Sequence, residues 1–318
     1  MPIALVVHGG AGSIAPERVG PANEGCQLAG QHGWQILQNG GSALDAVEAV
    51  VRALEDDPHY NAGTGSCLNA LGAIEMDASI MEGQSLQVGA IACVERIKNP
   101  ITLARRVLES SHVLLSGTGA QEFALEQGIP LCRREDLLTE RQYNNWRLLR
   151  EEQRENEPTI HRRELGSVQA RVETQETGVG SQTTPSQENT EGKHGTVGAV
   201  ALDTAGRLAV ATSTGGFTNK HPGRIGDSPL IGCGFYADES AAISCTGYGE
   251  DFMRLLLAKR AADFVARGMN ARDAAEAAIA LLGAKTTGTG GLIVVDRFGN
   301  VGFSWNSQNM AYAYFQEA

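Results

Sequence analysis

The stretch His194-Gly195-Thr196-Val197-Gly198 joins two unlike parts of the chain. Before it, the segment from Glu151 to Lys193 is polar and contains no aromatic residue, whereas an apolar strand pattern begins at Gly198. A threonine that follows glycine at such a junction is where a self-cleaving precursor would be cut. Cleavage of the Gly195–Thr196 bond would place a free α-amine, with a reference pKa of about 7.7–8.0, beside the Thr196 hydroxyl. A nucleophile and its general base would then belong to one residue.

Composition narrows the classes of protein to consider. The chain has 318 residues, a formal net charge of −11 and 39 glycines, which suits a compact α/β enzyme and disfavours nucleic acid or anionic membrane as a partner. The six cysteines form no CxxC pair, so a metal finger is unsupported and reduced thiols are expected. We find no secretory signal and no apolar run of about 18 residues. A cytoplasmic protein is predicted.

The order of the expected elements predicts the fold class. Strand Ile3–Val7 runs into a loop over 8–12, and helices are expected at 23–38, 42–57, 101–111, 119–128 and 133–152. Strands are expected at 73–80 and 86–94, and residues 153–193 are too polar to bury a core and are interpreted as a flexible linker. After Thr196, apolar hairpins over 198–212 and 291–305 flank a strand at 241–245 and helices at 250–267 and 271–282. Hairpins require antiparallel sheets, so we predict two packed, mainly antiparallel sheets covered by helices, an αββα sandwich.

The loop His8-Gly9-Gly10-Ala11-Gly12 resembles the backbone oxyanion loop of lipases, but the chain has no G-x-S-x-G nucleophile motif. The chain also lacks the phosphate-binding G-x-x-x-x-G-K-[ST] and the zinc-binding HExxH motifs. We therefore favour a structural role for His8 in a tight turn.

Three further segments carry polar groups suited to a site. Thr214 ends the strand expected to pair with the Thr196 strand, and hairpin geometry returns it towards Thr196 unless it is merely a turn hydroxyl. Arg224 and Asp227 lie in a loop rich in Gly and Pro, where they would bind the carboxylate and ammonium of an amino acid or form a salt bridge with each other. The turn Ser244–Glu250 presents backbone N–H groups that suit an oxyanion, or serves only to connect a strand to a helix.

These residues together resemble the plant-type L-asparaginases, or isoaspartyl peptidases, which are threonine-type N-terminal nucleophile hydrolases. The matching stretches are Val7–Gly12, Asn61–Gly65, Met76–Ala78, Gly195–Asp203, Thr212–Gly216, Gly223–Pro229 and Cys245–Glu250. The resemblance implies autocleavage into an α subunit, 1–195, and a β subunit, 196–318, that assemble as a dimer of heterodimers, (αβ)2. It implies hydrolysis of L-asparagine and of β-aspartyl dipeptides through a β-aspartyl-enzyme, without a cofactor for catalysis.

The resemblance also assigns roles. Thr196 would be the nucleophile, Thr214 would tune its hydroxyl, and Thr246 and the Gly247 N–H would form the oxyanion hole. Arg224 would bind the substrate α-carboxylate and Asp227 the α-ammonium, with Gly249 lining the pocket and Asn61 close to the scissile bond. A structural Na⁺ would be held by main-chain carbonyls, which by position belong to Leu54, Glu55, Asp57, Tyr60, Ala62 and Thr64. Two alternatives stay open, a glycosylasparaginase-type amidase and an uncleaved amino-acid-binding protein.

Overall fold

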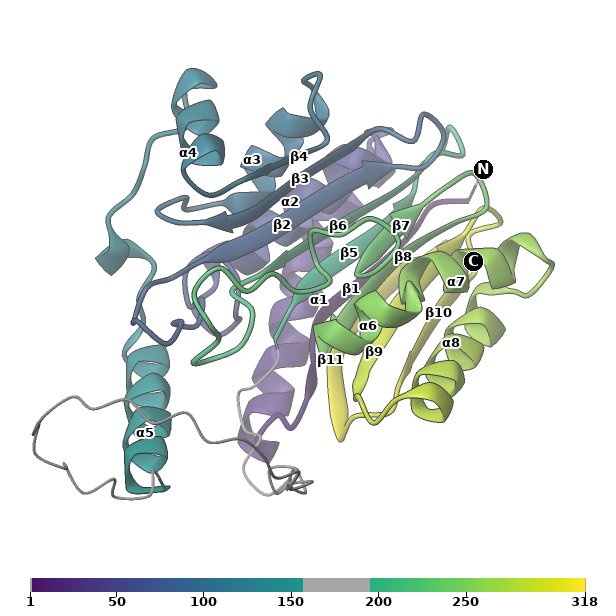
Figure 1. The fold of residues 1–318 in the computed structure, drawn as a ribbon. Helices are drawn as coiled ribbons and strands as arrows, with labels where there is room; N and C mark the ends of the chain where they lie inside the picture. The colour runs from purple at the N-terminus through teal and green to yellow at the C-terminus, as the bar shows by residue number, and fades with distance from the viewer. Residues whose placement is uncertain (1, 157–194, 318) are drawn as a thin grey trace, which may run out of the picture.

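The structure, a computed structural model, describes residues 2–156 and 195–317 as a mixed α/β fold with two sheets (Figure 1). The larger sheet has seven strands in the order β11-β1-β5-β6-β2-β3-β4, antiparallel except for the β3–β4 pair. Their bounds are β1 (Ala4–Gly12), β2 (Met76–Glu82), β3 (Val88–Val94), β4 (Leu114–Ser116), β5 (Val197–Leu202), β6 (Leu208–Thr214) and β11 (Asn309–Gln316). The smaller sheet is antiparallel and has the order β10-β9-β8-β7. Its strands are β7 (Phe235–Ala237), β8 (Ala241–Gly247), β9 (Gly290–Asp296) and β10 (Val301–Trp305).

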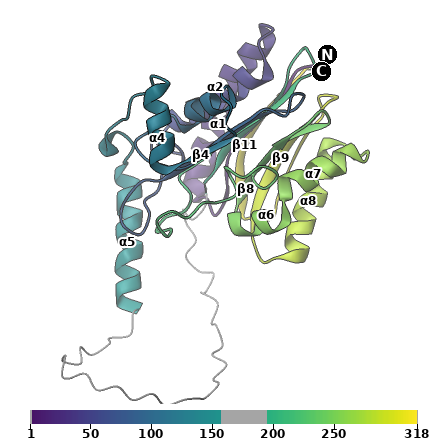
Figure 2. The same cartoon turned by 45° about the horizontal axis from the view of Figure 1, so that its top comes forward.

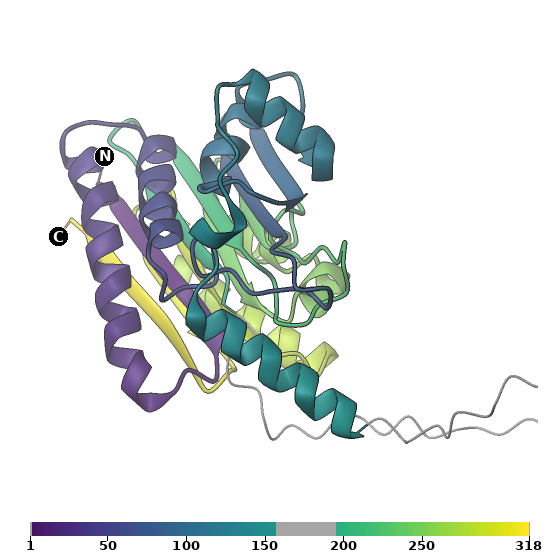
Figure 3. The same cartoon turned by 90° about the vertical axis from the view of Figure 1, so that its left-hand side faces the viewer.

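The two sheets pack face to face, and helices cover their outer faces. The inter-sheet core joins residues such as Val200 and Val210 of the larger sheet to Ile293 and Val295 of the smaller one. On the far side of the larger sheet lie α1 (Pro16–Gln38), α2 (Ala43–Asp56) and α3 (Pro100–Leu108), as Figure 3 shows. The smaller sheet is covered by α7 (Leu257–Ala266) and α8 (Ala271–Lys285). The prediction of two mainly antiparallel sheets with helices outside them matches this arrangement.

Strand β5 shows why the sequence after Thr196 is apolar without a break. All of its residues are buried: Val197, Ala199 and Ala201 face the helices, while Val200 and Leu202 face the smaller sheet. A strand covered on both faces needs apolar side chains at every position. The sequence pattern thus marks the centre of the fold.

Helix ends follow the predicted capping residues. Ser42 caps α2 by accepting a hydrogen bond from the Asp45 N–H at 3.1 Å, and Asn270 caps α8 in the same way through the Asp273 N–H at 2.9 Å. The remaining helices are α4 (Gly117–Glu126), α5 (Glu140–Asn156), α6 (Gly249–Leu255) and the 3-10 turn η1 (Arg134–Asp136). Figure 2 shows α5 projecting from the body of the molecule.

Several predicted boundaries were wrong. The loop expected over 8–12 is the second half of β1, which pairs with β11, a strand that was not predicted. The helix expected over 250–267 is broken at Leu256, where φ is +52°, into α6 and α7. One helix over 133–152 was expected, but η1 precedes a separate α5 that continues past residue 153. Nearly all of the linker predicted over 153–193 lies outside the described residues.

Within residues 2–156 and 195–317, none of the helices has the length and apolar character needed to cross a membrane.

Candidate active site

Thr196 stands at the entrance to the central strand. It immediately precedes β5, is 6% exposed, and β5 lies between β1 and β6. The β5–β6 register pairs Val197 with Ser213, so the next position along this ladder places Thr196 opposite Thr214. The predicted proximity of these two threonines therefore follows from strand register.

The smaller sheet delivers Thr246 to the same region. Its hydroxyl oxygen is buried and accepts a hydrogen bond from the Ala11 N–H at 3.3 Å. The neighbouring Gly10 lies against Gly195, because a Cβ on Gly10 would be 3.0 Å from the Gly195 Cα and 3.6 Å from the Thr196 carbonyl oxygen. The irregular end of β1 thus contacts both Gly195 and Thr246. Gly247 has a φ of +155° and leaves no room for a side chain against Thr289.

Asn61 braces the turn after Thr214. Its side-chain amide donates to the Gly216 carbonyl at 2.7 Å and its Oδ1 accepts from the Cys67 N–H at 2.8 Å. A Cβ on Gly195 would be 2.9 Å from the Asn61 Cβ, so Asn61 also contacts Gly195, the residue before Thr196. The Thr214 hydroxyl oxygen accepts from the Gly216 N–H at 2.9 Å. Thr214 therefore stabilises the turn that follows it, which was the alternative considered from the sequence. It also lies opposite Thr196.

A buried polar network joins the larger sheet to the smaller one. His8 Nε2 is 2.7 Å from the Ser244 hydroxyl, which is 3.1 Å from the Thr212 hydroxyl. Gly198 makes the contact between the sheets possible, because a Cβ there would collide with both His8 and Ser244. Burial lowers the pKa of His8 to about 3, so the ring stays neutral. The tight turn expected at His8 was wrong, because the residue lies within β1.

The predicted substrate-binding residues lie together. Gly249 contacts both of the others, because a Cβ there would be 2.8 Å from Asp227 Oδ1 and 3.0 Å from Arg224 Nη2. Asp227 is 3% exposed, and its Oδ2 has no hydrogen-bond partner among the described residues. Burial raises the pKa of Asp227 to about 7, although the nearby Arg224 charge acts in the opposite direction. An unpartnered buried carboxylate of this kind is suited to binding a cation.

Arg224 pairs with Glu250 and not with Asp227. Its Nε and Nη2 donate to the two Glu250 carboxylate oxygens at 2.9 and 2.8 Å, and its guanidinium lies 4.5 Å from the centre of the Phe217 ring. The salt bridge considered between Arg224 and Asp227 is therefore wrong. Glu250 was given no role by sequence reasoning, because nothing in the strand-to-helix turn shows which cation its carboxylate meets.

Sequence reasoning also missed Lys220 and Asp77. Lys220 is 1% exposed, and its ammonium donates to the Glu75 carbonyl at 2.7 Å beside Gly216. Asp77 is fully buried, accepts from the Cys93 N–H at 2.8 Å, and has its pKa raised by burial against the opposing charge of Lys220. A lysine within a polar loop sequence gives no sign that it will be buried, so only the structure reveals these charges behind the site.

The loop predicted to bind sodium closes on itself. The Thr64 N–H donates to the Glu55 carbonyl at 2.8 Å, and the Tyr60 N–H to the Asp57 carbonyl at 3.2 Å. Each of these carbonyl oxygens retains a second lone pair, which is the hard oxygen donor that Na⁺ prefers. In the described part of the chain no three His, Cys, Asp or Glu side chains gather as a metal site.

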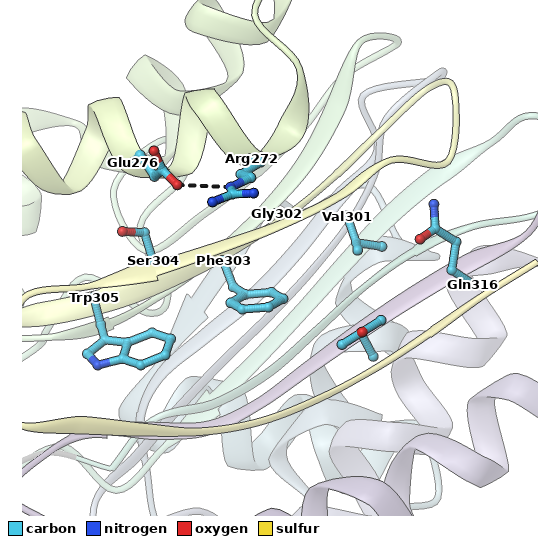
Figure 4. A pocket seen from close by; sticks show the side chains of 9 residues that line it. Arg272, Glu276, Val301, Gly302, Phe303, Ser304, Trp305 and Gln316 are labelled. Carbon is cyan, nitrogen blue, oxygen red and sulfur yellow. Dashed lines mark hydrogen bonds and ion pairs between the residues drawn. The ribbon is translucent and has the colours of Figure 1, made fainter. Parts of the chain in front are cut away.

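A separate groove of about 550 Å³ between α8 and β10 contains none of these residues. Figure 4 shows Phe303 and Trp305 in it, together with Arg272, whose Nε lies 3.0 Å from Glu276 Oε1. Arg272 is thus already paired, and the groove presents no nucleophile beside a base.

In this mixed α/β fold, Thr196, Thr214 and Thr246 stand at or next to the ends of strands from both sheets, and Asp227 is buried in the connection between β6 and β7. A protein-family model described as asparaginase matches residues 1–318, and the chain belongs to this family.

Three relatives match this chain over nearly its whole length. A plant-type L-asparaginase of Thermococcus kodakarensis is 45% identical over 99% of this chain and 96% of its own length. A plant-type L-asparaginase of Pyrococcus abyssi is 44% identical over 99% of this chain and 97% of its own. The isoaspartyl peptidase/L-asparaginase of Homo sapiens is 42% identical over 98% of this chain and 92% of its own.

Proposed function

We propose that this protein is an isoaspartyl peptidase and L-asparaginase with the N-terminal nucleophile fold, which cleaves itself between Gly195 and Thr196. The observation that carries the proposal is the position of Thr196, at the start of the central strand and opposite Thr214, in a chain of the asparaginase family. Full-length relatives named for both activities support the substrate class.

Self-cleavage begins with the Thr196 hydroxyl. The oxygen attacks the Gly195 carbonyl, the peptide C–N bond breaks as the Thr196 nitrogen takes up a proton, and an ester joins Gly195 to Thr196 Oγ. Water then hydrolyses the ester, giving a carboxylate on Gly195 and a free α-amine on Thr196. The tight contacts of Gly195 with Gly10 and Asn61 support this step, because they hold the scissile carbonyl in one place. The α subunit is 1–195 and the β subunit 196–318.

Substrate hydrolysis uses the same oxygen. The α-amine accepts the hydroxyl proton as Oγ attacks the β-carbonyl of the aspartyl group, and Thr214 orients the hydroxyl. The Thr246 hydroxyl and the Gly247 N–H donate to the oxyanion; Thr246 accepts from Ala11 and so keeps its own proton for this bond. The amine or ammonia leaves with a proton, and water releases aspartate from the acyl-enzyme.

Substrate recognition rests on Arg224, Asp227 and Gly249. The unpartnered Asp227 oxygen suits the α-ammonium, and Gly249 keeps space open between the two charged groups. Arg224 binds the α-carboxylate, for which the substrate must share or replace Glu250.

Two further parts of the proposal concern stability and assembly. The carbonyls of Leu54, Glu55, Asp57, Tyr60, Ala62 and Thr64 would hold one Na⁺ that fixes the loop beside Asn61 and takes no part in the reaction steps. Two cleaved chains would assemble as (αβ)2.

The deciding experiment is the intact mass of the purified protein beside a Thr196→Ala variant. We expect two fragments from the wild type, an uncut variant of 33.6 kDa, and hydrolysis of β-aspartyl dipeptides by the cleaved protein only. A wild-type chain that stays uncut after long incubation would favour the amino-acid-binding alternative. Faster release from glycoasparagine than from β-aspartyl dipeptides would favour the glycosylasparaginase alternative.

A further inference from the structure

A small cavity of about 60 Å³ lies directly beside the scissile junction. The residues that line it include Gly10, Arg18, His59, Asn61, Arg141 and Gly195. Arg224 and Asp227 are not among its walls. The cavity is thus a second recess next to Thr196, separate from the residues proposed to read the aspartyl group.

Two guanidinium groups meet in this cavity. Nη2 of Arg18 and Nη2 of Arg141 both donate to the His59 carbonyl, at 3.1 and 3.3 Å, so the two positive charges lie close together. Arg141 also donates to the carbonyl of Pro58 at 2.9 Å. Within residues 2–156 and 195–317, every side-chain hydrogen bond of these two arginines runs through Nη2 to a main-chain carbonyl. The other guanidinium nitrogens are available to a ligand.

The positive charge of the cavity is poorly neutralised. Neither arginine forms an ion pair in the described part of the chain. The Asp57 carboxylate acts on the charge of Arg141, but its Oδ1 lies 2.7 Å from the His59 ring nitrogen Nδ1 and accepts from the His59 N–H at 2.9 Å. Burial, together with repulsion from Arg18, lowers the pKa of Arg141 to about 10. Two like charges held together in a half-buried recess favour an anion between them.

We propose that Arg18 and Arg141 bind the α-carboxylate of the residue that leaves when a β-aspartyl dipeptide is cut. This inference rests on the proposed function. Cleavage separates Gly195 from Thr196, and because Gly195 is part of the wall, its release joins the cavity to the nucleophile. The α-carboxylate of a leaving residue is one carbon away from the nitrogen that is expelled, so a recess adjoining the reacting carbonyl is within its reach.

Binding by Arg18 and Arg141 distinguishes β-aspartyl dipeptides from L-asparagine. Ammonia leaves from L-asparagine and carries no carboxylate, so the two arginines contribute to dipeptide binding alone. Arg18 and Arg141 are therefore specificity-determining residues, and they favour isoaspartyl peptidase activity over asparaginase activity.

The test compares three substrates on cleaved protein: β-aspartyl-leucine, β-aspartyl-leucinamide and L-asparagine. The variants are Arg18→Gln and the milder Arg141→Lys, each checked for cleavage by intact mass. The matched control is Arg134→Gln, since Arg134 also donates to a main-chain carbonyl, that of Gly72 at 2.6 Å, but lies outside the cavity.

We expect the ratio of kcat/KM for β-aspartyl-leucine to that for L-asparagine to fall about tenfold in Arg18→Gln, mainly through KM. The ratio of kcat/KM for β-aspartyl-leucinamide to that for L-asparagine should be the same in Arg18→Gln and in the wild type. The Arg134→Gln control should match the wild type on all three substrates. A loss shared equally by all three substrates would overturn the proposal, because it would mean that the arginines only support the loop or hold the Gly195 carboxylate. Unchanged ratios would overturn it as well. Failure of the wild type on every substrate would instead refute the proposed function.

Discussion

Because of Asp227, kcat/KM should fall unusually steeply as the pH is lowered. Its carboxylate must be ionised to bind the substrate ammonium, yet burial raises its pKa to about 7, with the charges of Glu250 and Asp77 adding to the rise and Arg224 opposing it. At pH 6, one unit below that pKa, about a tenth of the molecules carry the ionised form. The Thr196 α-amine, with a reference pKa of about 7.7–8.0, must also lose a proton before it acts as a base.

Because two groups must each lose a proton, the slope of kcat/KM against pH should be about twice that for a single titration. Between pH 6 and pH 5, kcat/KM of the wild type should fall about a hundredfold, whereas Asp227→Asn should fall about tenfold because one titration is gone. At pH 8 the variant should be about tenfold to a hundredfold slower, since it lacks the charge that pairs with the ammonium. The assay is ammonia release from L-asparagine at subsaturating concentration over pH 5–9. A variant that keeps the wild-type slope would refute the assignment of Asp227.

Four other changes test separate parts of the structure. Glu250→Gln should lower KM for L-asparagine several-fold, because Arg224 no longer has a charged partner for the substrate carboxylate to displace; a raised KM would contradict this. Gly198→Ala should cost about 1–3 kcal/mol of unfolding free energy in urea, since its Cβ collides with His8 and Ser244. Gly119→Ala is the control for added volume, because a Cβ there meets no atom within 4 Å and the residue has no positive φ. The His8 pKa is lowered to about 3, so the unfolded state binds a proton first and stability should fall as the pH drops from about 6.5 towards 3; His8→Gln should flatten this dependence by up to about 1.4 kcal/mol per pH unit, measured by urea unfolding. Replacing NaCl by choline chloride should lower the melting temperature if the carbonyl loop binds Na⁺, and an unchanged melting temperature would remove that ion from the proposal.

The sequence predicted best where local chemistry decides the structure. Ser42 and Asn270 cap helices because their side-chain oxygens accept from the N–H three residues on, a contact that needs no information from the rest of the chain. The pairing of Thr196 with Thr214 is nearly as local, since a hairpin fixes its own register.

Long-range pairing was harder to predict. Strand β11 was missed because its partner, β1, lies at the opposite end of the chain, and β1 was given as a loop from His8 onward because three glycines follow that histidine. The bulge between His8 and Ala11 accommodates Gly9 and Gly10 within the strand, and Gly12 pairs with Asn309.

Charge pairing could not be deduced either. Arg224 was placed with Asp227 on proximity along the chain, but its partner Glu250 comes from the turn that begins α6. Arg18 and Arg141 lie 123 positions apart and meet only because α1 and α5 both begin beside the loop that carries the His59 carbonyl.

The strand order of the larger sheet decides what becomes of the two pieces after the chain is cut at Gly195. Strands β1, β2, β3 and β4 would belong to one piece and β5, β6 and β11 to the other, yet in space they alternate as β11, β1, then β5 and β6, then β2. Three hydrogen-bonded seams, β11–β1, β1–β5 and β6–β2, would run between separate polypeptides. Neither piece alone has all the strands of the larger sheet, so the uncut chain acts as its own assembly template, and pieces expressed apart should aggregate through their bare strand edges.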